Sequence, residues 1–233
     1  SRIGLAGSGL QTAAIAFGGA TPTTVDATEL YDGSSWSNTA PMTTARKDLG
    51  GAITAPSALS LAFGGGPPES NATEEFSNFS EPSSFENEGQ VFYNDTENKF
   101  KLIASTSAPT WASGGNYPAN IQRQAGFGTQ TATVNASGYL ATAYSTQTAE
   151  YDGTAWTAAN ASPAALESPG GGGVLTAGFI CGGESTAPTK VTTTAEYDGT
   201  NWTAGGNLGT GRSSLMVAGT QTAGIAAGGG PGS

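Results

Sequence analysis

Short apolar runs separated by polar, glycine-rich stretches set the pattern of this chain. Each run is apolar on both faces of an extended strand, which is typical of a strand covered on both sides. A Gly-Gly pair that ends the run permits a tight bend. The copies are QTAAIAFGG (11–19), SALSLAFGG (57–65), QTATVNASG (130–138), LTAGFICGG (175–183) and QTAGIAAGG (221–229). The pattern therefore predicts five copies of one buried strand.

A second motif follows the first. It occurs as ELYDGSSW (29–36), AEYDGTAW (149–156) and AEYDGTNW (195–202), with a weaker copy that ends at Phe76. Asp-Gly after a Tyr predicts a hairpin turn, and the Trp opens the next strand. No apolar pattern of helical period is sustained, and Gly, Thr and β-branched residues dominate, so helices are not expected.

The two motifs recur with a regular period of about 46 residues, which is typical of a repeat architecture. One interval is longer and predicts an insertion at 79–105 in the second copy. All four Trp of the chain belong to the repeat. They are Trp36, Trp111, Trp156 and Trp202.

Each repeat predicts four short strands, and such a unit cannot bury both of its faces alone. Radial stacking of the units buries them, which makes a β-propeller. We therefore expect one all-β domain over 1–233 with about five blades. The repeats are 1–45, 46–120, 121–165, 166–211 and a partial copy at 212–233. The last blade lacks two strands, so either the ring closes with a half blade or the native chain continues past Ser233.

The order of apolar run, Gly-Gly, Tyr, Trp and Arg resembles the kelch repeat over 1–78 and 106–229. The copies depart from it at Ser137-Gly138, at Phe76 and near Glu167, where the Arg is absent. The strings GTQTA, TAEYDGTAW and LAFGGG also resemble kelch-like structural and tail proteins of marine tailed phages, including cyanophages. This resemblance implies a rigid module between partner chains or a receptor-facing tip.

Composition excludes several kinds of chemistry. The chain has no His, so a His general base, a His metal site and the copper site of galactose-oxidase-type kelch enzymes are ruled out. One Cys allows neither an internal disulfide nor a thiolate zinc site. A net charge of −10 without a basic run argues against nucleic-acid binding. No apolar stretch is long enough for membrane insertion. We expect no cofactor, no metal and no catalytic residue.

The recurring aromatic and charged residues are expected to serve the repeat. Tyr31, Tyr151, Tyr197 and the four Trp should form the core between blades, with sugar stacking as the alternative. The Arg residues precede the first strands and should bond carbonyls and acids of the neighbouring blade, with an anion-binding ring as the alternative. They are Arg2, Arg46, Arg123 and Arg212. The Asp of each YDG should be a turn residue rather than a calcium ligand or glycosidase acid.

The insertion is the least repetitive segment. Two short alternating stretches, 90–93 and 99–103, predict a β-hairpin, and GQVFYNDTENKFKLI resembles a hairpin module of phage tail proteins. Insertions of propellers project from one face, so this one is a candidate contact surface. Its alternative is a solvated or blade-capping hairpin. The candidate residues are Glu86, Glu88, Phe92, Tyr93, Asp95, Glu97 and Lys99.

Taken together, the sequence predicts a non-enzymatic virion structural or tail-associated module, in the virion or outside the cell. Its expected partners are other virion proteins, a host-surface receptor or a glycan, and homo-oligomers are possible. The alternative is a secreted carbohydrate-binding, lectin-like propeller, which a glycan array would distinguish. An intracellular kelch adaptor and an enzyme rank lower.

Overall fold

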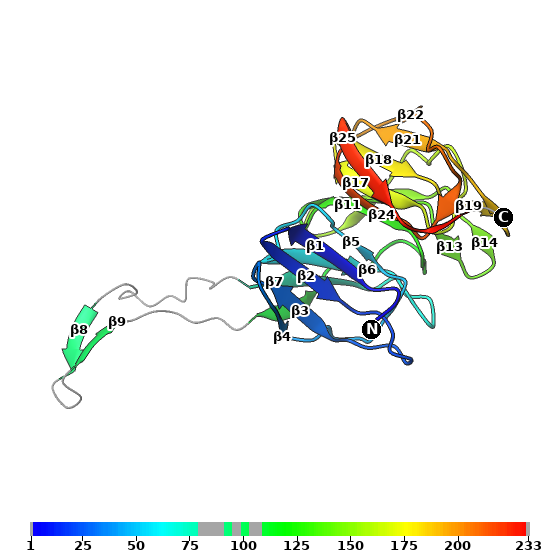
Figure 1. The fold of residues 1–233 in the computed structure, drawn as a ribbon. Helices are drawn as coiled ribbons and strands as arrows, with labels where there is room; N and C mark the ends of the chain where they lie inside the picture. The colour runs from blue at the N-terminus through cyan, green and yellow to red at the C-terminus, as the bar shows by residue number, and fades with distance from the viewer. Residues whose placement is uncertain (1, 79–90, 95–98, 103–108, 232–233) are drawn as a thin grey trace.

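The computed structural model describes residues 2–78, 91–94, 99–102 and 109–231, and this part of the chain consists of strands and turns without a helix (Figure 1). Four-stranded antiparallel sheets follow one another around a centre as the blades of a β-propeller. The predicted all-β propeller with an incomplete last blade is confirmed. None of the described residues belongs to a helix that is long and apolar enough to cross a membrane.

The repeats correspond to blades with the strand order of a meander. Blade 1 contains β1 (Ala6–Leu10), β2 (Ala13–Phe17), β3 (Thr28–Tyr31) and β4 (Trp36–Thr39). Blade 2 contains β5 (Gly50–Gly51), β6 (Leu59–Phe63), β7 (Thr73–Ser77) and β10 (Thr110–Ser113). Blade 3 contains β11 (Ala125–Thr129), β12 (Ala132–Ala136), β15 (Thr148–Tyr151) and β16 (Trp156–Ala159). Blade 4 contains β17 (Gly170–Val174), β18 (Ala177–Cys181), β21 (Thr194–Tyr197) and β22 (Trp202–Ala204).

Within the described residues, the fifth blade contains two long strands, β24 (Met216–Thr220) and β25 (Ala223–Ala227). Short antiparallel pairs complete the structure. They are β13 (Tyr139–Leu140) with β14 (Ala143–Tyr144), β19 (Glu184–Thr186) with β20 (Thr189–Lys190), and β23 (Arg212–Ser213) with β26 (Gly230–Pro231). In the insertion, β8 (Val91–Asn94) pairs with β9 (Lys99–Leu102), which confirms the predicted hairpin.

The first strands of successive blades lie closest to the centre, and glycine permits their close approach. A Cβ atom on Gly126 would lie 2.7 Å from the carbonyl oxygen of Gly51 in the preceding blade. On the second strand of blade 4, a Cβ atom on Gly178 would lie 2.0 Å from the ring of Phe127 in blade 3. Since no side chain fits in these spaces, the glycine-rich composition follows from the packing of blade on blade.

A chain of backbone hydrogen bonds links the blades at the centre. Just before the strand that lies closest to the centre, each blade carries a residue with φ between 52° and 62°, and from blade 2 onward the amide of this residue donates to the carbonyl of the corresponding residue one blade earlier. The bonds run from Asp48 to Gly4, Arg123 to Asp48, Ser168 to Arg123 and Ser214 to Ser168, with lengths of 2.8, 2.9, 2.8 and 3.0 Å. This series of hydrogen bonds fixes the position of each blade relative to the one before it.

The core lies between blades. Ile15 and Phe17 of blade 1 pack with Leu49 and Phe76 of blade 2, and equivalent clusters lie at the later blade junctions. The centre of the second strand is buried in four blades: Ile15 is 2%, Leu61 0%, Val134 0% and Phe179 8% exposed. The equivalent Ile225 of the half blade is 65% exposed. The same repeat position is therefore core wherever another blade follows.

One pair of identical substitutions tests this assignment. Ile15→Ala removes a buried side chain and should lower the free energy of unfolding by about 2–5 kcal/mol. Ile225→Ala, at the same repeat position, should change it by less than about 0.5 kcal/mol because the side chain is exposed. Urea unfolding followed by Trp fluorescence measures both. Equal losses for the two variants would contradict the assignment of Ile225 to an open face.

Candidate functional site

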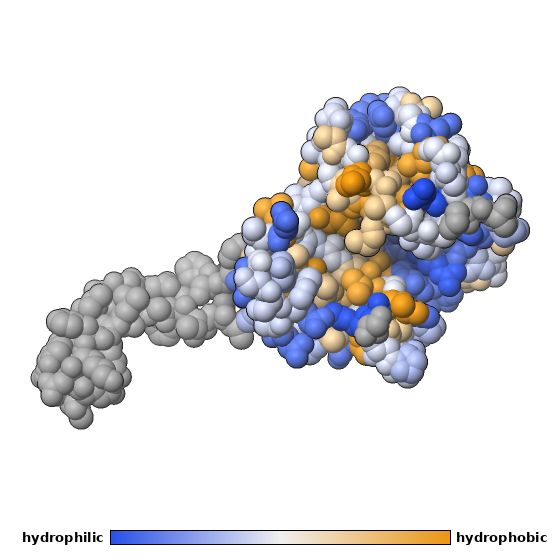
Figure 2. Space-filling view, in the orientation of Figure 1, coloured by the Kyte–Doolittle hydropathy of each residue, from blue (hydrophilic) through white to orange (hydrophobic). Residues whose placement is uncertain are grey.

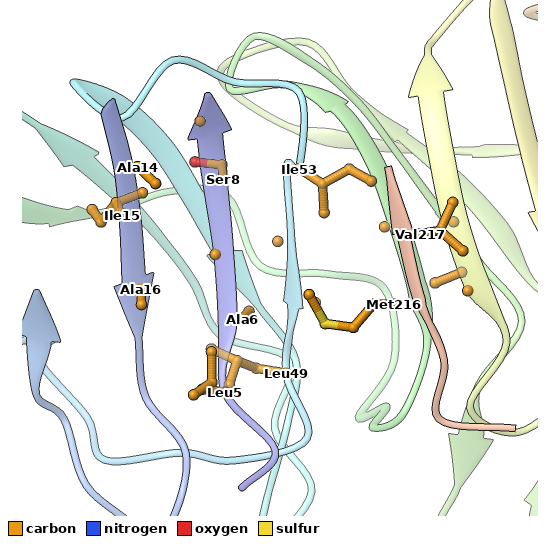
Figure 3. A pocket seen from close by; sticks show the side chains of 18 of the residues that line it. Leu5, Ala6, Ser8, Ala14, Ile15, Ala16, Leu49, Ile53, Met216 and Val217 are labelled. Carbon is orange, nitrogen blue, oxygen red and sulfur yellow. The ribbon is translucent and has the colours of Figure 1, made fainter. Parts of the chain in front are cut away.

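A hollow of about 870 Å³ opens between blade 1 and the half blade (Figure 2). Its walls are the central strands β1, β5, β11, β17 and β24 together with one face of blade 1. Ile53 and Met216 point into it, and Leu5, Ala14 and Ala16 lie on the side of blade 1 (Figure 3). We call this hollow and the outer edge of β25 the open side of the propeller.

The open side is mainly apolar and largely exposed. Met216 is 78%, Ile225 65% and Leu5 43% exposed. Among the residues that line the hollow, the charged ones are Arg2 and Glu29, and they form an ion pair with each other. Contiguous exposed apolar surface of this kind is typical of protein interaction sites.

The repeat arginines Arg2 and Arg46 bond within their own blade, not the neighbouring blade that the sequence analysis expected. Arg46 donates to the carbonyls of Gly64 and Ala72 and to Glu74, at 2.6, 2.9 and 2.8 Å. Burial lowers the pKa of Arg46, and the charge of Glu74 opposes this shift. Arg2 makes the same set of bonds to Gly18, Ala27 and Glu29. Each Arg thus ties the end of the second strand to the third.

Arg123 does not share this register, and its predicted equivalence is wrong. The amide of Gly19 bonds the carbonyl of Arg46, and the equivalent amide of Gly65 bonds the carbonyl of Ile121. Ile121 therefore occupies the arginine position, and Arg123 lies two residues later. It pairs with Glu167 and, at 3.7 Å, with Asp48.

Arg123 lines a smaller polar hollow of about 510 Å³. Tyr144 lies there and donates to Glu184 at 3.1 Å. Desolvation and the nearby carboxylates of Glu184 and Glu167 raise the pKa of Tyr144 to about 12, so its hydroxyl stays a donor at neutral pH. The charged side chains of this hollow thus form ion pairs and hydrogen bonds with one another.

Three of the repeat Trp join successive blades. Trp111, Trp156 and Trp202 each donate their indole N–H to the Thr that begins the third strand of the preceding blade, at 3.2, 2.9 and 3.3 Å. Trp36 of blade 1 departs from the expected burial: it is 52% exposed and lines the hollow. No blade precedes it in the described part of the chain, so the Thr acceptor is missing there.

The repeat Tyr follow the same rule. Tyr151 donates to Glu75 and Tyr197 to Glu150, both at 2.5 Å and both across a blade junction. Burial and the partner carboxylate raise the pKa of each phenol. Tyr31 packs against Trp36 with ring centroids 5.1 Å apart, as Tyr151 and Tyr197 pack against the Trp of their own blades, but no blade precedes it in the described part of the chain. The aromatic pair of blade 1 is therefore presented at the open side.

The Asp of each YDG motif stabilises its turn. Asp32 accepts backbone N–H bonds from Ser34 and Ser35, both at 2.8 Å, and the equivalent Asp152 and Asp198 do the same. These bonds lower the pKa of all three carboxyls. In the described part of the chain, no group of three or more Cys, Asp or Glu side chains could hold a metal ion.

The predicted contact residues of the insertion are mostly not observed. Glu86, Glu88, Asp95 and Glu97 lie outside the described residues. Phe92, Tyr93 and Lys99 lie in the paired strands β8 and β9.

The single cysteine, Cys181, is buried in β18, and burial raises the pKa of its thiol.

Comparisons with known proteins support the fold. No protein-family model matches the chain, and no curated protein matches it. Among solved structures, the chain is similar to one titled "Structure of YjhT", with a TM-score of 0.62 and 11% sequence identity. The match covers 93% of this chain and 69% of that chain. The chain therefore shares a propeller-type fold with a solved protein.

The open side was not among the predicted sites. The last blade was expected to lack two strands, but the residues that this leaves uncovered were not among the candidate residues. The signal was present, because Ile225, Arg212 and Trp36 occupy repeat positions whose partners lie on an adjacent strand or blade.

A substitution pair tests the role of the buried ion pair. Arg46→Leu leaves Glu74 buried without its partner and should lower the free energy of unfolding by about 3–5 kcal/mol. The double variant Arg46→Leu/Glu74→Ala reproduces the Leu166 and Ala195 pair of blade 4 and should recover most of that loss. Urea unfolding provides both values. A double variant no more stable than Arg46→Leu would refute the equivalence of the two arrangements.

Proposed function

We propose that this chain is a non-enzymatic binding module that holds a protein partner at its open side. The observation that carries the proposal is the apolar open side itself, where Met216 and Ile225 are exposed. The residues that correspond to Ile225 in the four complete blades are buried in the core. Apolar patches beside an unpaired strand edge are a common basis of protein association.

The finer proposal places the module in a virus particle, as a structural or tail-associated protein. The support for this placement is the resemblance of the repeat sequences to those of kelch-like proteins of tailed phages. The low content of charged residues, 11%, is compatible with a particle exterior because few ion pairs make stability little dependent on salt. The partner is then another particle protein or a host-surface receptor.

Density-gradient fractionation with peptide mass spectrometry tests this placement. Peptides of the chain should co-sediment with capsid and tail peptides. If they remain with soluble proteins at the top of the gradient, the virion proposal fails, and a glycan array then tests the secreted, carbohydrate-binding alternative.

A pair of surface variants tests the open side within the same experiment. Particles that carry Met216→Asp/Ile225→Asp should lose the chain during the gradient, at least tenfold relative to the unmodified protein, because charge opposes apolar docking. Leu10→Asp is the matched control, since Leu10 is 73% exposed but does not line the hollow. Retention of the double variant would show that the partner binds elsewhere.

A further inference from the structure

The side of blade 4 that faces blade 3 contains a pocket of about 260 Å³. Its floor consists of Leu166, Ile180 and Ala195, which are 3%, 1% and 6% exposed. The ring of Trp202 forms part of the wall, and the rim includes the exposed Asn207. Protein interiors are packed so closely that spaces larger than a water molecule are few. A pocket with a buried apolar floor is therefore a departure from the packing of this core.

The same place in the other blade junctions is held by a large side chain. In each junction, one buried residue donates its amide to a carbonyl of the preceding blade. These bonds run from Met42 to Asp26, from Tyr117 to Asn71 and from Ser162 to Thr146, at 2.9, 2.8 and 2.9 Å. Met42, Tyr117 and Ser162 therefore occupy one repeat position, and only the last of the three is small.

Tyr117 packs against the counterparts of the pocket residues. Its cluster in blade 3 contains Ile121 and Ala149, with the partly buried Ala119 and Trp156 against it. The repeat register gives the blade 4 counterparts of these four residues, and all of them line the pocket. They are Leu166, Ala195, Ala164 and Trp202. The pocket of blade 4 is thus the space that the ring of Tyr117 fills in blade 3.

Two serines explain why this space stays open in blade 4. The hydroxyl of Ser162 bonds that of Ser137 at 2.9 Å, and Ser162 does not line the pocket. Ser137 stands where blade 1 has Gly18, on which a Cβ atom would lie 3.1 Å from Met42. Glycine therefore makes room for a large side chain in the first junction, whereas the serine pair replaces both residues here.

The environment of Tyr117 indicates what the pocket can hold. Its ring meets that of Trp156 edge to face, with centroids 5.1 Å apart and planes at 78°, a geometry that aromatic pairs prefer. Burial raises the pKa of Tyr117 to about 12, and the amide of Asn135 opposes this shift. The counterpart of Asn135 in blade 4 is Ile180, so an aliphatic group replaces the polar neighbour of the hydroxyl.

The size of the pocket agrees with a single ring. An engineered apolar cavity of about 150 Å³ lined by Leu, Ile and Phe side chains binds benzene. The pocket of 260 Å³ therefore has room for one six-membered ring, and its exposed rim leaves a way in.

From these observations we propose that the pocket of blade 4 is a binding site for one uncharged aromatic ring of the phenyl type. The ring lies edge to face with Trp202, between Ala164 and Ala195, and above Leu166 and Ile180. This site is separate from the open side and does not rest on the proposed function.

Fluorine NMR on the full-length chain measures ring binding directly. Fluorobenzene serves as a free ring, and 4-fluorophenylalanine capped at both ends serves as a side chain on a backbone. Fluorobenzene should show saturable binding at one site. Tighter binding of the capped amino acid would identify a partner's side chain as the source of the ring, and tighter binding of fluorobenzene would identify a small molecule.

Variants that fill the pocket should abolish this binding. Ala195→Leu extends the floor into the space of the ring and should weaken the binding of fluorobenzene about tenfold or more. Ala164→Leu should do the same from the opposite side. Ala112→Leu is the matched control, because Ala112 is exposed on β10 and does not line the pocket. Its affinity should equal that of the unmodified chain.

Urea unfolding separates a filled pocket from a damaged core. Ala195→Leu should keep the unfolding midpoint, because the added group enters open space. Ala149→Leu, at the same position of blade 3, should lower the midpoint, because Tyr117 already fills that space.

Three results would overturn the proposal. They are the absence of saturable binding for both probes, unchanged binding to folded Ala195→Leu and Ala164→Leu, and a lower unfolding midpoint for Ala195→Leu that matches that of Ala149→Leu. The second result would assign the ring to the larger hollow of the open side.

Discussion

The backbone hydrogen bonds between blades are the constraint on which the rest of the structure depends. The residue with positive φ in each later blade donates its amide to its predecessor, as Ser168 does to Arg123, and the amide of the second bend glycine donates to a carbonyl of the next blade, as Gly138 does to Leu166. Because these groups are main-chain atoms, the side chains around them can vary. This explains how Ile121 or Leu166 can replace Arg without a change of fold.

The position beside the bend shows two chemical solutions to one packing problem. Arg46 with Glu74 satisfies buried carbonyls by charged donors, whereas Leu166 with Ala195 fills the space with apolar atoms. A buried ion pair and an apolar pair of similar volume can be equally stable, but a mixed pair leaves a charge without a partner. The two residues of a blade are therefore coupled, and this coupling gives each third strand a preferred blade.

Much of the fold follows from the sequence because the repeat is regular. The period and the Trp positions indicate the blades, and the alternating stretches around Asn94 indicate the β8–β9 hairpin. Arg123 was assigned to the wrong repeat position because that position was identified by residue type, as an Arg that precedes a first strand. Arg123 lies 15 residues before Gly138, whereas Arg2 lies 17 before Gly19 and Arg212 lies 17 before Gly229, and counting back 17 residues from Gly138 reaches Ile121. The acceptors of Trp and Tyr could not be predicted, since they depend on how adjacent sheets lie side by side.

The open side follows from the same dependence of each blade on its neighbours. Ile225 and Trp36 have the residue types of their buried counterparts, so their exposure reflects what adjoins them rather than what they are. This surface combines exposed apolar side chains with the edge of β25 and the guanidinium of Arg212, which donates to Gly228. In protein association, apolar area is a source of affinity, whereas strand edges and charges restrict what can pair with them.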